Sequence, residues 1–177
     1  IIAAGLNSQG EILPKGSLNY TLTKELDFSG MSLSGLYHTV DVQSATLSHA
    51  TLLGKDMVIK ALSGDIFVSE STITAENTLT IQTPQMFTNL HSQIQSKEGT
   101  FYASTLINKG KCFIQADHLS FETSSFFNQK ENLLSPLIFS KENFSLQTHM
   151  LINQGTFFSS QSGEIFAHDL TNENLMY

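Results

Sequence analysis

Two segments of the chain, Leu106-Ile107-Asn108-Lys109-Gly110 and Leu151-Ile152-Asn153-Gln154-Gly155, are near copies of each other, 45 residues apart. A looser version, Leu6-Asn7-Ser8-Gln9-Gly10, stands near the start. Working outward from these segments, asparagine recurs at spacings of about 19, 20, 25 and 19 residues, at Asn89, Asn108, Asn128, Asn153 and Asn172. A recurrence of this length indicates a repeat architecture. Each period holds two short apolar runs and little room for a helix, so the sequence predicts an all-β fold with one turn of a parallel β-helix per period.

The second apolar run of each period alternates apolar and polar residues. The clearest copies are Met57-Val58-Ile59, Leu79-Thr80-Ile81, Leu119-Ser120-Phe121 and Phe144-Ser145-Leu146. In a strand, this alternation turns one set of side chains inward and the other outward. We therefore expect these runs to lie in register in successive turns.

The recurring asparagines predict a specific local structure. Asn tolerates a left-handed backbone and Gly adopts one freely, so the Asn column predicts sharp corners between strands. Asn side chains stacked one above another can also form amide ladders along the axis. A row of Asn that binds a ligand is the alternative. The aromatic residues are expected to stack in core columns, at Phe113, Phe121, Phe144 and Phe157, and the alternative is an exposed strip for sugar stacking.

We expect one domain over residues 1–177, with a less regular start over 1–30, coils over 31–177 and an irregular loop near 129–138. This loop lies in the longest period, the 25 residues between Asn128 and Asn153, and its Pro136 cannot donate a ladder hydrogen bond. About seven to eight coils at a rise of ~4.8 Å would form a short rod. The chain begins Ile1-Ile2-Ala3-Ala4, without Met or a basic signal region, so we expect a fragment of a longer rod.

Composition excludes several classes of function. The net charge is −7 and the sequence contains no Arg, which argues against nucleic acid and anionic membranes as partners. No stretch approaches the ~20 apolar residues of a membrane span, so we expect no membrane insertion. Cys112 is alone and cannot form an internal disulfide, and it is expected to be a small strand residue rather than a reactive thiol.

The pattern Leu-x-Asn-x-Gly followed by an apolar strand, at about 20 residues, resembles the haemagglutinin repeats of large bacterial exoproteins. These are the filamentous haemagglutinin-like adhesins and the contact-dependent inhibition exoproteins of the two-partner secretion route. The resemblance covers about residues 85–177 well and 40–84 loosely. The sequence departs from the pattern at Asn89 and Asn128, because neither is followed by Gly two residues later.

The resemblance implies a right-handed parallel β-helix in a secreted or cell-surface protein, forming part of a long rod. It implies a structural or adhesive stalk without catalysis. The implied partners are an outer-membrane transporter during export and a receptor or glycan on a host or neighbouring cell. An antiparallel β-sandwich adhesin is a further alternative.

A carbohydrate-active β-helix enzyme, either a polysaccharide lyase or a glycoside hydrolase, is the main alternative. A glycosidase needs two carboxyl groups roughly 5–10 Å apart. Glu76, Glu98, Asp117 and Glu142 could form a column at one corner, although we expect them to be solvated turn residues. Lys109 and Lys111 are the available bases for a lyase, but such enzymes often use Arg, which is absent. We therefore expect no catalytic residue and no cofactor.

The histidines give no metal-binding spacing of the type His-x-x-x-His. We expect all six to be surface or corner residues: His38, His49, His91, His118, His149 and His168. No Asp-rich calcium loop is present either. The sequence therefore predicts no metal site.

Overall fold

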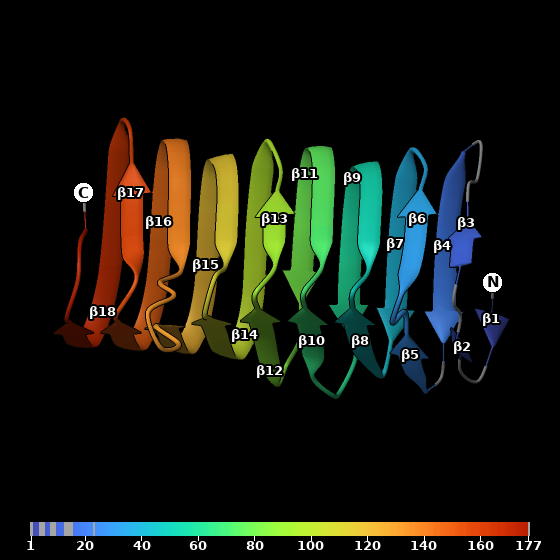
Figure 1. Cartoon of the computed structure of the whole chain (residues 1–177), viewed down its shortest axis with the longest axis horizontal. Helices are drawn as coiled ribbons and strands as arrows, with labels where there is room; N and C mark the ends of the chain where they lie inside the picture. Colours follow the sequence, from blue (N-terminus) through green and yellow to red (C-terminus); the bar gives the residue numbers. More distant parts are fainter. Residues whose placement is uncertain (1, 4–5, 8–9, 13–15, 23, 177) are drawn as a thin grey trace.

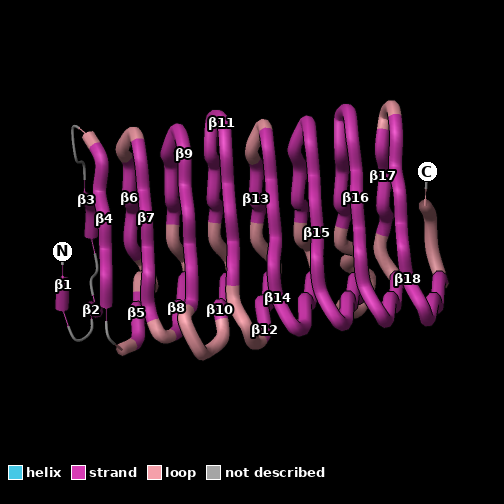
Figure 2. The backbone as a smooth tube through the Cα atoms, turned by 180° about the vertical axis from the view of Figure 1, so that it is seen from behind, coloured by secondary structure: helices cyan, strands magenta, loops and turns pink. Residues whose placement is uncertain are grey.

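A computed structural model describes residues 2–3, 6–7, 10–12, 16–22 and 24–176. The regular structure of these residues is entirely β, and the chain winds into a β-solenoid of about seven turns. Successive turns lie side by side along one axis, from the N-terminal end to the C-terminal end (Figure 1). Figure 2 shows the same stack from behind, with strands making up most of each turn. No helix in the described part is long and apolar enough to cross a membrane.

Each turn contributes three strand segments, and each segment pairs in parallel with its equivalents in the neighbouring turns. The three resulting ladders are here called the groove face, the Asn face and the third face. The groove face contains β1 (Ile2–Ala3), β4 (Ser17–Leu22), β7 (Tyr37–Val42), the ends of β9 (Thr51–Ala61) and β11 (Thr72–Gln82), the start of β14 (Glu98–Lys109), the middles of β15 (Phe113–Gln129) and β16 (Leu137–Asn153), and the start of β18 (Ser162–Asn172).

The other two ladders are built in the same way. The Asn face contains β2 (Leu6–Asn7), β5 (Glu25–Asp27), β8 (Ser44–Ser48), β10 (Ile66–Ser69), β12 (Met86–Leu90) and the ends of β14, β15, β16 and β18. The third face contains β3 (Gly10–Ile12), β6 (Met31–Ser34), β13 (Gln93–Gln95), β17 (Thr156–Ser159) and the starts of β9, β11, β15 and β16. Because all three ladders are parallel, the antiparallel sandwich alternative is wrong.

The alternating runs lie in register, as the sequence predicted. Met57 pairs with Leu79, and Leu119 pairs with Phe144. Leu79 and Leu119 both pair with Gly99 of the turn between them. The inward residues of the runs from Met57 to Leu146 are buried, because the two-residue period of a strand sends alternate side chains to the interior.

Phenylalanines form the core of the C-terminal half. The rings of Phe87, Phe101 and Phe121 stack at centroid distances of 5.9 and 4.8 Å. Phe144 and Phe157 continue the packing at 5.4 Å, and each buried ring contributes about 1.5–3 kcal/mol. Phe121, Phe144 and Phe157 are therefore buried as expected. The expectation for Phe113 is wrong: it is only half-buried, because its neighbour Ile114 occupies the inward position.

The asparagines form a buried amide ladder. Each side chain donates from Nδ2 to Oδ1 of the next asparagine along the chain, at 2.8, 2.9, 2.7 and 2.8 Å, through Asn89, Asn108, Asn128, Asn153 and Asn172. All but the last are fully buried. This confirms the predicted ladder and leaves no free amide row for a ligand.

The corners between strands lie two residues after the asparagines rather than at them, so the predicted corner position is wrong. The asparagines lie within strands, and the left-handed backbone occurs at His91 (φ 52°) and Gly110 (φ 78°), two residues after Asn89 and Asn108. A Cβ on Gly110 would overlap the imidazole of His91. Gly110 is therefore required both by its φ and by the ring beside it.

The stretched period forms a surface loop over residues 130–136, between β15 and β16. The loop closes through an antiparallel bridge between Glu131 and Leu134. Leu133 at its tip is 98% exposed, whereas Ile138, just after the loop, is back in the core. Part of the less regular start expected for residues 1–30 lies outside the described residues.

Candidate functional site

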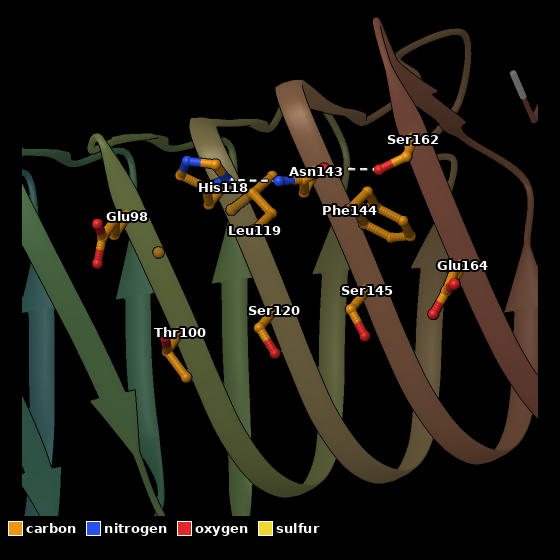
Figure 3. Close-up of a pocket in the computed structure, with 11 residues that line it drawn as sticks. Glu98, Thr100, His118, Leu119, Ser120, Asn143, Phe144, Ser145, Ser162 and Glu164 are labelled. Carbon is orange, nitrogen blue, oxygen red and sulfur yellow. Dashed lines mark hydrogen bonds between the residues drawn. The ribbon is translucent and has the colours of Figure 1, made fainter.

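A shallow, open groove of about 420 Å³ crosses the groove face in the C-terminal half. Its walls come from four consecutive turns, and Figure 3 shows that most of the labelled side chains are polar. The residues that line it are Glu98, Gly99, Thr100, His118, Leu119, Ser120, Asn143, Phe144, Ser145, Ser162 and Glu164. They meet because in-register stacking places equivalent residues of each turn one strand spacing apart, about 4.8 Å.

A hydrogen-bonded row runs along one edge of the groove. The amide Nδ2 of Asn143 donates to Nδ1 of His118 at 3.0 Å, and the hydroxyl of Ser162 donates to Oδ1 of Asn143 at 2.6 Å. Since Nδ1 of His118 accepts, the neutral ring carries its proton on Nε2, which lies 3.2 Å from the carboxylate of Glu142. This row is already paired, so it stiffens the groove edge.

A second row offers free hydroxyls. Thr100 pairs in the ladder with Ser120, and Ser120 with Ser145, so their outward side chains line up along the axis. Ser145 in turn pairs with Glu164. Such a row can exchange hydrogen bonds with a polyhydroxylated or amide-bearing ligand, but the groove holds no closely spaced pair of carboxylates.

The column of acidic residues considered for catalysis does not form. Glu98 pairs with Thr78 on one side and His118 on the other. Asp117 precedes His118, and its carboxylate faces the ammonium of Lys141 at 3.8 Å. The sequence pattern placed Glu98 and Asp117 at equivalent positions, but the ladder sets Asp117 beside Lys97 and Glu98 beside His118, so the two acids are offset by one residue.

Lys109, one of the two lysines considered as a base, contacts Glu131 together with His91, and these three residues are here called the clasp. The ammonium of Lys109 lies 3.1 Å from the Glu131 carboxylate, and Nε2 of His91 lies 2.5 Å from its other oxygen. The backbone N–H of Lys111 donates to Nδ1 of His91, so neutral His91 presents an Nε2–H to Glu131. The hydrogen bond from Lys109 holds the pKa of the Glu131 carboxyl below its usual range. This clasp ties the 130–136 loop to the two preceding turns.

Cys112 is not positioned as a nucleophile. It is 3% exposed, and its Sγ donates to the carbonyls of Asn89 and Lys109 at 3.2 and 2.9 Å. Burial raises the pKa of the thiol, so the reactive thiolate is disfavoured. The residue lies just before β15 rather than within a strand, which corrects the secondary-structure expectation but agrees with its small, structural role.

The histidines divide into different environments. The expectation of a surface position is wrong for His38, which is 2% exposed and donates a hydrogen bond from Nε2 to the carbonyl oxygen of Leu53 at 3.0 Å. Desolvation lowers the pKa of His38. His149 and His168 are exposed and stack on each other in adjacent turns. A search for short spacings such as His-x-x-x-His missed this pair. The two histidines are one repeat period apart, and that spacing is the signal that could have found them.

Comparison with known proteins gives one informative similarity. The chain is 27% identical over 108 residues, 61% of its length, to a protein from Yersinia pestis described as Toxin CdiA. It fits a CdiA-like haemagglutinin-repeat region. The chain spans 3% of that relative's length. No family model matches the chain, and no solved structure matches it. The similarity and the parallel β-solenoid together support a segment of a two-partner-secretion exoprotein.

Proposed function

We propose that this chain is a structural and adhesive stalk segment of a secreted or cell-surface bacterial exoprotein, without catalysis of its own. The observation that carries the proposal is the asparagine ladder, which runs unbroken from Asn89 to Asn172. An unbroken row that joins the consecutive turns from Asn89 to Asn172 suits a stiff spacer, because each turn is stabilised by its neighbours. The toxic activity named for the CdiA relative would then belong to other parts of such a protein.

The site geometry supports this proposal over the enzyme alternative. Glu98 and Glu164 line the same groove but lie about three turns apart, or roughly 14 Å, which exceeds the spacing a glycosidase uses. The hydroxyl row of Thr100, Ser120 and Ser145 instead offers a flat hydrogen-bonding surface. This surface is our candidate for contact with a glycan or receptor on another cell.

Surface display can be tested with antibodies raised against the 177-residue chain. In the native organism, intact cells should be labelled, and labelling should disappear when the outer-membrane transporter that exports the protein is deleted. Labelling that appears only after the cells are lysed would contradict the proposal.

Adhesion and catalysis can be separated with the purified chain. Beads coated with it should bind target cells, and Thr100→Val with Ser120→Val should weaken binding if the hydroxyl row is the contact surface. Unchanged bead binding in that variant would remove the row from the proposal and leave a stalk role. In parallel, turnover of an acidic polysaccharide that is lost in Glu98→Gln with Glu142→Gln would overturn the non-catalytic assignment.

A further inference from the structure

Two histidines and an aspartate converge on the outer surface where β16 and β18 meet. The pairs Thr148 with Ala167 and Met150 with Asp169 flank His149 and His168, so the two histidines occupy equivalent places in consecutive turns. Their rings stack with centroids 4.6 Å apart and planes 20° apart. They were brought together by the repeat, although 18 residues separate them in the sequence.

Asp169 completes the cluster. One carboxylate oxygen lies 3.3 Å from Nδ1 of His168, and the other lies 3.8 Å from Nε2 of His149. One ligand atom from each of the three residues lies within 4.8 Å of the others. Ligand atoms around a tetrahedral zinc ion are about 3.3 Å apart, since zinc–nitrogen bonds are about 2.0–2.1 Å. The three ligand atoms are therefore farther apart than around one ion, so the side chains must move inward and reorient to share it.

The exposure of the three side chains permits that movement. His149, His168 and Asp169 are 67%, 72% and 65% exposed, so no core packing holds their rotamers. Imidazole lone pairs lie in the ring plane, so the stacked rings must turn at the side-chain torsions to aim at a common ion. Two imidazoles with one carboxylate suit divalent ions of the zinc, nickel and copper class rather than calcium or magnesium, which prefer oxygen ligands.

We propose that His149, His168 and Asp169 form a surface site for one zinc-class divalent ion, which cross-links two successive turns of the solenoid. Water fills the remaining coordination positions. The parallel register supplies the site: one His comes from each turn, and the residue after the second His provides the carboxylate.

The chain provides a matched control for the test. His49 and Glu70 also form an exposed histidine–carboxylate pair, with Nδ1 and the carboxylate 3.3 Å apart. His91 occupies the corner equivalent to Glu70 in the following turn, but its ring contacts Glu131, and among the described residues His49 and Glu70 belong to no three-residue group able to hold a metal. His49→Gln therefore removes a similar surface pair without touching the proposed site.

Isothermal titration of the 177-residue chain with ZnCl₂ at about pH 7.5 should show one ion bound per chain. His149→Gln and His168→Gln should each weaken binding at least about tenfold, and His49→Gln should leave it unchanged. Copper(II) added in place of zinc should give an electron paramagnetic resonance signal with coupling to two imidazole nitrogens. The proposal is overturned if the chain binds no zinc at millimolar concentration, or if both histidine variants bind like the wild type.

Discussion

The side chain of Asn108 donates from Nδ2 to Oδ1 of Asn128 at 2.9 Å, with both residues fully buried. The same polarity repeats at every rung, so all the amides point the same way along the axis. At the N-terminal end, the buried Oδ1 of Asn89 has no hydrogen-bond partner, because the preceding turn places Val68 at that position. The interior amides of the ladder thus have hydrogen-bond partners on both sides, and the cost of an unpaired buried acceptor falls on Asn89 at the N-terminal end.

Replacing an interior rung should be much more destabilising than replacing the last one. Asn108→Ala strands Nδ2 of Asn89 and Oδ1 of Asn128, and we expect a loss of about 2–4 kcal/mol in the free energy of unfolding. Asn172→Ala strands one donor, Nδ2 of Asn153, and removal of the exposed Asn172 side chain opens that donor to water, so we expect a loss of only about 1 kcal/mol. Urea denaturation of both variants checks this difference, and equal losses would argue against the ladder as a stabilising element.

Burial of His38 should make stability depend on pH. Desolvation lowers the pKa of the His38 imidazole below its ordinary value of about 6.5, so between the folded and unfolded pKa values the unfolded chain binds a proton that the folded chain does not. The free energy of unfolding should therefore fall as the pH drops below about 6.5, by up to about 1.4 kcal/mol for each pH unit between the two pKa values. Denaturation of the wild type and His38→Leu across this range isolates the contribution. Their stability difference should change with pH, and a difference that stays constant across this range would contradict the account of His38.

The clasp at Glu131 should order the loop in a pH-dependent way. Its lowered pKa means that the contribution is present above the unfolded value near 4.5 and is lost as the pH falls through the folded value. Glu131→Gln removes the charge that Lys109 faces. Hydrogen exchange over residues 130–136 should be faster in this variant at neutral pH. Indistinguishable exchange in the two proteins would mean that the ion pairs do not hold the loop.

Gly110 should tolerate substitution poorly. Its φ of 78° disfavours any Cβ, and the ring of His91 occupies the space that a Cβ would need. We expect Gly110→Ala to lower the free energy of unfolding by about 1–3 kcal/mol. Gly163→Ala is the matched control, because its nearest neighbour would be 3.5 Å away at ordinary contact distance. Thermal unfolding of the pair separates the specific requirement at Gly110 from a general effect of removing glycine.

Features that recur in every turn could be predicted from the sequence, whereas features that depend on a local departure from the repeat were missed. The period and the alternation in Leu79–Ile81 and Leu119–Phe121 were sufficient for the parallel register and for the Asn ladder. The inward position of Ile114 was missed because Phe113 has the larger apolar side chain, and the phase of the alternation is set by neighbouring turns rather than by size. A surface position was expected for His38, but its burial depends on the space left by Gly54, where a Cβ would lie 2.7 Å from the ring.

The site residues were harder to predict for the same reason. The alignment of Glu98 with Asp117 was wrong by one residue, because the ladder pairs Glu98 with His118 and the sequence pattern does not fix the register that closely. The pairing of His149 with His168 depends on contact between turns, which a search for short linear spacings does not examine. Contacts of this kind follow from the sequence only after the length of every turn is known.

Disulfide trapping tests the parallel, in-register stack most directly. In a Cys112→Ala background, Thr100→Cys with Ser120→Cys places two thiols at paired positions of adjacent turns, about 4.8 Å apart in the backbone and within disulfide reach. Thr100→Cys with Ser145→Cys places them two turns apart, at roughly 10 Å, which is beyond that reach. Mild oxidation followed by mass spectrometry should find an intramolecular disulfide in the first variant and not in the second. A disulfide in the second variant but not in the first would contradict the stacking of the turns.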